Sequence, residues 1–350
     1  MRVIIFSSIF ALASAGAGCG NEKPDLTVKT TSTGLSFRVL QVPDVHFTGD
    51  SNFPCNGGVA NVTKCTEAYM EATLGRMLDD VKPDIVVFTG DQIEALSRPT
   101  SHNAEVPVRA YSKPVIARKL PWAMVYGNHD ENNKNPEKGP DKWATMELIE
   151  SLPLAYSKAG PKGIGGVSNY HLNVKAPADG FWGKTNRDIF RMYFVDTGIT
   201  GNFTVPQADY FKSLASDYHA QNVPALMFFH IPTPHYKNFT GVGQGAKGET
   251  VTAGKNNVGL YDAMVAMGDV KASFVGHDHY NDYCFFEKPI HLCYGGGVGY
   301  GAAYGKPEYS RRARVIEWSL TPERESIDTY IYRQTAANDF EKYNIFQRKP

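Results

Sequence analysis

The chain has 350 residues, a formal net charge of zero and 21% charged residues. A chain of this length can bury a full core as one large domain or as two average ones. The balance of charges gives no basis for capturing nucleic acid or an anionic membrane by bulk electrostatics, and it favours a small substrate that is recognised locally.

The segment 1–18 has the pattern of a secretory signal peptide. Arg2 precedes an apolar run at 3–13, and small residues suited to cleavage follow. That run is too short to cross a bilayer, and no later stretch approaches the roughly 20 apolar residues that a spanning helix needs. We therefore expect a protein that is secreted, extracellular or in the secretory lumen. Cys19 could carry a lipid, but Gly16 stands where lipid attachment favours leucine, so simple cleavage is preferred.

Residues 19–34 are polar and lack a pattern, which predicts an N-terminal tail or an edge strand. Beyond them, short apolar runs alternate with stretches of helical periodicity. Strands are expected at 37–42, 84–89, 121–126, 170–174, 189–196, 225–229, 272–275, 283–286, 290–294, 314–320 and 327–332. Helices are expected at 66–81, 107–118, 141–152, 207–220 and 256–267. The simplest interpretation is one α/β domain over 35–335, with two packed sheets, outer helices and a C-terminal tail at 336–350.

Sequons and cysteines agree with an oxidising compartment. The sequons begin at Asn61, Asn202 and Asn238, although such tripeptides also arise by chance. Apart from Cys19, the cysteines form two pairs that are close in sequence, Cys55/Cys65 and Cys284/Cys293. This spacing favours two local disulfides, although four cysteines allow three connectivities. A zinc site made of all four is disfavoured because no Cys-x-x-Cys spacing is present.

Polar residues that can bind metal follow the ends of several apolar runs. Gly127-Asn128-His129-Asp130 comes directly after the run 122–126. The same kind of position is taken by Asp44-Val45-His46, Gly90-Asp91, His230 and Gly276-His277-Asp278-His279. Open α/β sheets place ligands at the carboxyl ends of their strands, so these side chains are expected to meet.

This mixture of carboxylate and imidazole donors suits Zn, Fe or Mn better than Ca or Mg. Two such metals about 3.5–4 Å apart need a bridging carboxylate, and together they activate water and hold a phosphoryl group during in-line displacement. Asp91 follows the strand next to the first, and it is the natural bridge.

The ordered set of motifs resembles the signature of the calcineurin-like metallophosphoesterase superfamily. Within that superfamily the chain resembles the purple-acid-phosphatase-like branch of fungi and plants. The residues that carry this resemblance are Leu40-Gln-Val-x-Asp44-x-His46-Phe47, Phe228-Phe-His-Ile-Pro232, Gly276-His-Asp-His279 with Asn281-Asp-Tyr-Cys284, and Leu292-Cys-Tyr-Gly-Gly-Gly297. The similarity covers residues 35–335.

The resemblance implies a four-layer α-β-β-α sandwich of two mixed sheets, with a dinuclear metal site at the C-terminal ends of the strands. It implies a first metal held by Asp44, His46, Asp91 and His279. It implies a second metal held by Asp91, Asn128, His230 and His277, with Asp91 as the bridge. His129 would bind the phosphate and protonate the leaving group, and Asp130 would orient the His129 ring. Every one of these positions carries the expected residue type, so the sequence does not indicate a dead enzyme.

The chain departs from true purple acid phosphatases at two positions. Those enzymes have glycine where this chain has His46, and a metal-binding tyrosine where this chain has Glu94. Without that tyrosine no tyrosinate can give iron its purple colour. We therefore expect a colourless relative with two divalent or trivalent transition-metal ions.

The resulting expectation is a secreted phosphatase that hydrolyses phosphate monoesters by attack of a metal-activated hydroxide, with a small phosphorylated substrate and no nucleic-acid partner. A phosphodiesterase or nucleotidase on the same core is the alternative, because the metal set fixes phosphoryl transfer without fixing the ester. A non-catalytic phosphate-binding protein is disfavoured by the intact donors. Isolated histidines are interpreted as turn or cap residues, namely His102, His171, His219 and His291.

Overall fold

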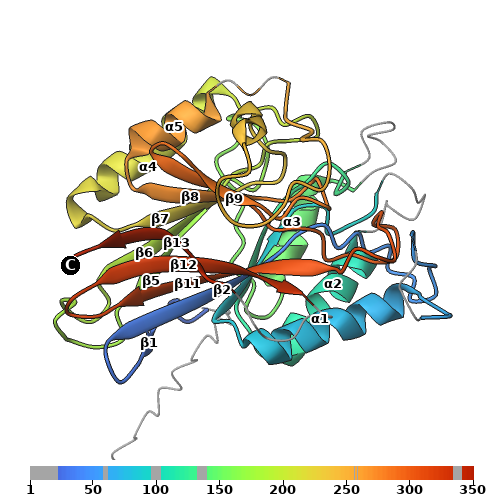
Figure 1. The fold of residues 1–350 in the computed structure, drawn as a ribbon, viewed down its shortest axis with the longest axis horizontal. Coiled ribbons are helices and arrows are strands. Elements are labelled where there is room, and N and C mark those ends of the chain that lie inside the picture. Colours follow the sequence, from blue (N-terminus) through green and yellow to red (C-terminus); the bar gives the residue numbers. More distant parts are fainter. Residues whose placement is uncertain are drawn as a thin grey trace, which may run out of the picture.

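The computed structural model describes residues 23–57, 62–95, 104–131, 140–255, 257, 259–333 and 341–350. The expected signal peptide, Cys19 and the sequon residue Asn61 lie outside these ranges. Two sheets pack face to face and carry helices on their outer sides, as Figure 1 shows. The predicted four-layer α-β-β-α sandwich of two mixed sheets is thereby confirmed.

The first sheet has the strand order β13-β12-β11-β2-β3-β4, with β1 paired to β2. Its parallel part consists of β2 (Leu35–Val42), β3 (Ile85–Thr89) and β4 (Trp122–Val125). Its antiparallel part consists of β1 (Lys29–Thr30), β11 (Arg312–Leu320), β12 (Glu325–Arg333) and β13 (Tyr343–Arg348). The parallel strands end at one edge of this sheet, and three of the predicted motifs follow them there.

The second sheet has the order β5-β6-β7-β8-β10-β9. Its strands are β5 (Tyr170–Lys175), β6 (Asp188–Phe194), β7 (Ala225–Phe228), β8 (Val270–Val275), β9 (Cys284–Glu287) and β10 (Ile290–Tyr294). Strands β6, β7, β8 and β10 run parallel, and the edge strands β5 and β9 are antiparallel to their neighbours. The remaining two predicted motifs follow β7 and β8.

Helices cover both outer faces. The first sheet carries α1 (Glu67–Val81), α2 (Glu105–Ala117) and α3 (Lys142–Ser151), and the second carries α4 (Val205–Tyr218) and α5 (Leu260–Met267). Two short 3₁₀ helices, η3 (His219–Gln221) and η4 (Pro234–Asn238), lie between them in the chain. Helix α4 starts at Val205 because Thr204 and Gln207 form a reciprocal capping box. No helix in the described ranges is both long and apolar enough to span a bilayer.

The hydrophobic core consists of three clusters, because successive side chains of a strand point to opposite faces of its sheet. In β3, Ile85 and Val87 face the space between the sheets, whereas Val86 and Phe88 pack on the helical side. Both faces of the strand are therefore buried, and this explains why its sequence is continuously apolar. A third cluster fills the space between the second sheet and α4 and α5.

Both chain ends of the domain add strands to the first sheet. Residues 29–30 form β1, in the segment expected to be a tail or an edge strand. Residues 343–348, which the sequence assigned to a C-terminal tail, form the edge strand β13 against β12. The predicted disulfides Cys55–Cys65 and Cys284–Cys293 are both present. The second joins residues that face each other on β9 and β10.

Candidate metal centre

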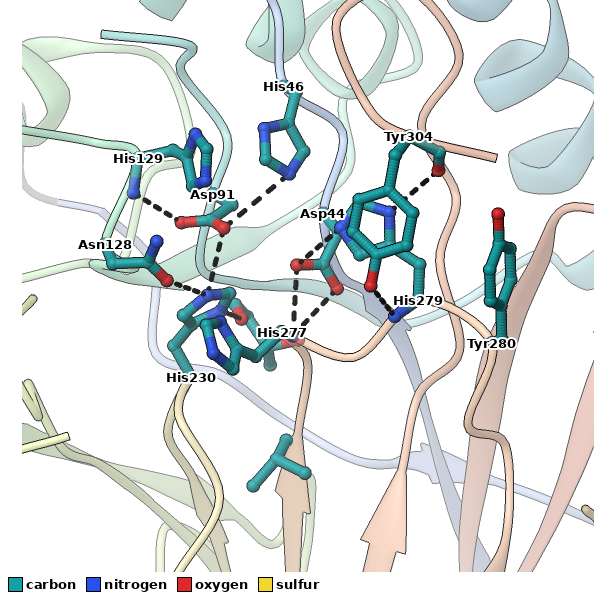
Figure 2. A network of polar contacts seen from close by, with 12 residues as sticks. Asp44, His46, Asp91, Asn128, His129, His230, His277, His279, Tyr280 and Tyr304 are labelled. Atoms are coloured by element: carbon teal, nitrogen blue, oxygen red, sulfur yellow. Dashed lines mark hydrogen bonds and ion pairs between the residues drawn. The ribbon is translucent and has the colours of Figure 1, made fainter. Parts of the chain in front are cut away.

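The motifs that follow β2, β3, β4, β7 and β8 meet between the carboxyl ends of the two sheets (Figure 2). All the predicted site residues lie in this one cluster: Asp44, His46, Asp91, Asn128, His129, Asp130, His230, His277 and His279. The first sheet supplies the first six of them and the second sheet supplies the three others. Sheet packing thus determines how the two halves of the site face each other.

Four site residues adopt a left-handed backbone conformation that non-glycine residues seldom take. Their φ angles are 56° at Asp44, 48° at His46, 54° at Asp91 and 78° at His277. Each such residue costs on the order of 1–3 kcal/mol, so the surrounding structure must impose it. Two backbone hydrogen bonds do so for the first loop, since Asp44 N donates to Gly90 O and His46 N donates to Asp91 O. The strain is therefore concentrated where the side chains are aimed at one another.

The Asp91 carboxylate lies at the middle of the cluster. Its Oδ2 atom is 3.1 Å from His230 Nε2 and 3.6 Å from His46 Nε2, and its Oδ1 atom accepts the backbone N–H of His129 at 2.8 Å (Figure 2). Residue 127 must be glycine here, because a Cβ atom on Gly127 would lie 2.2 Å from Asp91 Oδ1. The Asp91 carboxylate thus faces one histidine from each of the two sheets.

Three histidines have one ring nitrogen held by an acceptor and the other turned inward. His230 Nδ1 lies 2.9 Å from Thr89 O, His279 Nδ1 lies 3.0 Å from Tyr304 O, and His46 Nδ1 lies 2.9 Å from Glu94 Oε2. An Nδ1–H that donates outward leaves Nε2 with its lone pair free for a metal. The inner nitrogen of His46 is buried and has no hydrogen-bond partner. A bound cation would satisfy this atom, so the residues present fit a metal centre.

Three groups of side chains bring histidine nitrogens and carboxylate oxygens within 4.8 Å of one another, close enough to hold an ion together. One group is Asp44, His46 and His279, and another is Asp91, His230 and His277. Asn128 Oδ1 lies 3.1 Å from His230 Nε2, beside the second group. A third group, His46, Asp91 and His129, shares one residue with each of the other two. The first two groups each contain three of the four ligands that the family resemblance implies for one metal.

The structure corrects the predicted role of Asp130. Its carboxylate does not orient the His129 ring but accepts the backbone N–H groups of Asp91, Ile93 and Gly127 at 2.7–2.9 Å. The His129 ring is held by Glu94 instead, with Nδ1 at 3.0 Å from Oε2 and 3.1 Å from Oε1. Asp130 immediately follows His129 in sequence, but its side chain points to the backbone of residues 91, 93 and 127 instead of the His129 ring. Glu94 comes from the neighbouring loop and reaches the ring directly.

Sequence reasoning did not identify Glu94 or Tyr304 as part of the site. The Tyr304 ring stacks on His279 with centroids 3.7 Å apart, and its hydroxyl accepts the His279 backbone N–H (Figure 2). The same hydroxyl donates to Glu249. The only signal for Glu94 was its position three residues after Asp91, where true purple acid phosphatases have tyrosine. Tyr304 lies in the long connection between β10 and β11, beyond the Gly295-Gly-Gly297 motif, and no motif included Tyr304 itself.

Three other histidines of the described ranges contact aromatic side chains. His171 contacts Tyr218, His235 stacks on Tyr261 and His291 packs beside Phe286. Two arginines of the run 310–314 are structural, since Arg312 pairs with Asp282 and Arg314 donates to backbone oxygens. His102 lies outside the described residues.

The histidines of the site differ in their pKa values. Burial would lower the pKa of His230, but the Asp91 carboxylate outweighs it and raises this pKa to about 10. Burial alone would lower the pKa of His129, but the Asp91 and Glu94 carboxylates outweigh it and raise this pKa to about 9. Burial and the neighbouring His230 lower the pKa of His277 to about 3, which keeps that ring neutral and able to bind a cation. Burial lowers the pKa of His279 as well. Metal ions bound near Asp91 would make the pKa of His129 rise less, because their positive charge offsets that of the carboxylate.

Comparison with known proteins agrees with this geometry. Residues 37–281 match the family model described as calcineurin-like phosphoesterase. The chain belongs to this family. It is 33% identical over 319 residues to "Probable inactive purple acid phosphatase 29" of Arabidopsis thaliana, covering 84% of this chain and 79% of that protein. It is 34% identical over 310 residues to "Phosphatase DCR2" of Saccharomyces cerevisiae, covering 80% of this chain and 51% of that protein.

The fold is shared with a solved structure. A dimetal phosphatase from Danio rerio superposes with a TM-score of 0.54 at 11% identity, covering 89% of this chain and 99% of that structure. The expected resemblance to purple-acid-phosphatase-like proteins of plants and fungi is confirmed by the Arabidopsis and yeast relatives. Phosphoesterases of this kind act on phosphorylated substrates, and the clustered donors of this chain are candidates for two metal ions.

Proposed function

We propose that this protein is a secreted dinuclear metallophosphatase that hydrolyses phosphate monoesters. The observation that carries the proposal is the position of Asp91 Oδ2 between His230 Nε2 and His46 Nε2, at 3.1 and 3.6 Å. His230 and His46 belong to different donor groups. A carboxylate that faces both groups can bridge two metal ions and hold them close together. Imidazole and carboxylate donors favour Zn, Fe or Mn in these positions.

When bound, the metals would supply a hydroxide nucleophile and neutralise charge on the phosphoryl group. The chain's own contribution is binding and proton transfer. The His129 side chain is 30% exposed, whereas those of His46 and His230 are 3% and 0% exposed. It is thus the histidine among these three that a substrate can reach. With Nδ1 held by Glu94, Nε2 is left to donate a proton to the departing ester oxygen.

The Arabidopsis relative is named as probably inactive, whereas we propose that this chain is catalytically active. Our proposal of activity is supported by the complete donor set and by the proton-donor histidine. The preference for monoesters is supported by the yeast relative, which is named a phosphatase. Secretion is supported by the two disulfides, since disulfides persist in oxidising compartments.

A substrate panel tests the proposal. The purified protein, supplied with Zn²⁺, Mn²⁺ or Fe²⁺, would be assayed against an alkyl phosphate, p-nitrophenyl phosphate, bis-p-nitrophenyl phosphate and nucleotides. We expect the highest kcat/KM on monoesters and no hydrolysis by the matched Asp91→Asn protein. Faster cleavage of the diester or of nucleotides would replace the monoester assignment by a phosphodiesterase or nucleotidase. Phosphate binding without hydrolysis of any ester would contradict the enzymatic proposal.

A further inference from the structure

Glu94 connects two histidines of the site that belong to different loops. Its side chain is only 2% exposed, and its Oε2 atom lies 2.9 Å from His46 Nδ1 and 3.0 Å from His129 Nδ1. The two rings meet edge to face, with centroids 4.7 Å apart and planes at 73°. The three residues follow β2, β3 and β4, so one carboxylate ties together the ends of three parallel strands.

We propose that Glu94 is a positioning residue that serves the proposed metal ligand His46 and the proposed proton donor His129 at the same time. Metal retention at the first site and protonation of the leaving group would then depend on one carboxylate. This inference rests on the proposed function, which it deepens by naming the group that prepares both histidines.

The hydrogen-bonding capacity of a carboxylate explains why this position requires Glu. An ionised carboxylate only accepts hydrogen bonds, so both Nδ1 atoms facing it must carry hydrogen. That fixes the tautomer of His46 and leaves its Nε2 lone pair directed toward Asp91 Oδ2. For His129 it leaves Nε2 to give its proton to the leaving oxygen, while the negative charge of Glu94 compensates the imidazolium before transfer.

The described residues offer His129 Nδ1 no other hydrogen-bond acceptor. Asp130 uses both of its oxygens on backbone N–H groups. The Asp91 oxygen nearest to His129 accepts the backbone N–H of that residue and not the ring. Removing the Glu94 carboxylate would therefore free the His129 ring to rotate and would leave the tautomer of His46 unspecified.

The test uses Glu94→Gln with a matched control. Glutamine keeps the size of the side chain, but its single acceptor oxygen and its NH₂ donors cannot serve both Nδ1–H groups equally. The control is Glu67→Gln, because Glu67 is also a buried carboxylate and binds Thr48 and Gly49 in the loop that carries His46. Among the described residues, the Glu67 side chain accepts from the Thr48 backbone and hydroxyl and from the Gly49 backbone. A variant that merely loosens the fold should therefore behave like Glu67→Gln.

Two readouts are compared between the variants. Bound metal is counted after equilibrium dialysis, which needs no turnover, and kcat/KM is measured on an alkyl phosphate and on p-nitrophenyl phosphate. For Glu94→Gln we expect metal affinity at one of the two sites to fall about 10–100-fold, as for other residues that orient a metal-bound histidine. We also expect a loss on the alkyl ester at least about tenfold larger than on the aryl ester, whose leaving group needs little protonation. Glu67→Gln should lower thermal stability and leave both readouts unchanged.

Full metal retention in Glu94→Gln together with equal losses on both esters would overturn the inference. So would a Glu67→Gln protein with the same two defects, since the effect would then come from general loosening of the loops. If the wild-type protein binds two metals but hydrolyses no ester, the proposed function fails while the dialysis result still decides the part played by Glu94 at His46.

Discussion

Asp130 Oδ2 accepts a hydrogen bond of 2.9 Å from the backbone nitrogen of Asp91. The same carboxylate binds the backbone nitrogens of Gly127 and Ile93, so it joins the loops that follow β3 and β4. Asp91 has φ 54° in this turn, and the Asp130 bonds on either side of it hold that conformation in place. Asp130 thus supports the bridging carboxylate through the backbone.

Replacing Asp130 by asparagine should weaken the whole centre. The amide nitrogen would face at least one of the backbone N–H donors, and a buried donor without an acceptor costs about 1–3 kcal/mol. We expect urea unfolding to show a loss of that size, and dialysis to show weaker binding of both metals. The ratio of rates on alkyl and aryl phosphates should stay as in the wild type. A changed ratio with both metals retained would show that Asp130 acts on His129 after all.

The Asp91→Asn change should release both metals together, because Asp91 is the proposed shared ligand. His46→Ala and His230→Ala should each weaken mainly one site, since each lies in a different donor group. Metal content per chain, measured by mass spectrometry on dialysed protein, distinguishes these cases. Retention of two ions by the Asp91→Asn protein would exclude Asp91 as the bridge.

The His129→Ala change tests proton donation. Removing a general acid costs about 10²–10⁴ in rate when the leaving group needs the proton, so the loss on an alkyl phosphate should fall in this range. On p-nitrophenyl phosphate the loss should be much smaller, and metal content should not change. An equal loss on both esters would indicate that His129 stabilises phosphoryl charge, whereas loss of metal would make it a ligand.

Two histidines remote from the metal centre predict an acid-sensitive stability. Burial, with Arg191 and Lys158 nearby, lowers the pKa of His171 to about 4, and burial alone lowers that of His291 to about 4. Their unfolded pKa is about 6.5. Between these values the unfolded chain binds more protons, so their contribution to stability is complete above pH 6.5 and is lost as the pH falls toward 4.

The slope of unfolding free energy against pH measures this effect. Each histidine can contribute at most about 1.4 kcal/mol per pH unit, and less where solvent reaches the ring. We expect a double His171→Gln/His291→Gln protein to have a shallower slope between pH 4.5 and 6.5 than the wild type, in urea titrations of both proteins with chelator present. Parallel slopes would mean that other groups determine the acid sensitivity.

The sequence was sufficient to predict the meeting of the site residues, because parallel strands end at one edge and each motif directly follows such a strand. It was insufficient for contacts that depend on how the loops turn after the strands. Glu94 lies 48 residues from His46 and 35 from His129, and only the left-handed turn at Asp91 brings it to both. Asp130 was misassigned for the same reason, since adjacency to His129 in sequence says nothing about the direction of its side chain.

Edge elements were also hard to predict. Strand β13 has only one fully buried residue, Ile345, so its sequence shows no strong alternation. It is a strand because it pairs with β12, and this pairing cannot be read from the local sequence. Strand β1 is short, and it is defined by its pairing with β2.

The most direct test of the central claim is a metal titration of the chelator-treated protein. Zn²⁺, Mn²⁺ or Fe²⁺ would be added in separate series, with bound metal per chain and phosphate release from an alkyl phosphate followed in the same samples. We predict that the chain binds two ions and that phosphate release appears as the second is bound. Saturation at fewer than two ions, or hydrolysis that persists unchanged in the presence of chelator, would contradict a dinuclear centre built around Asp91.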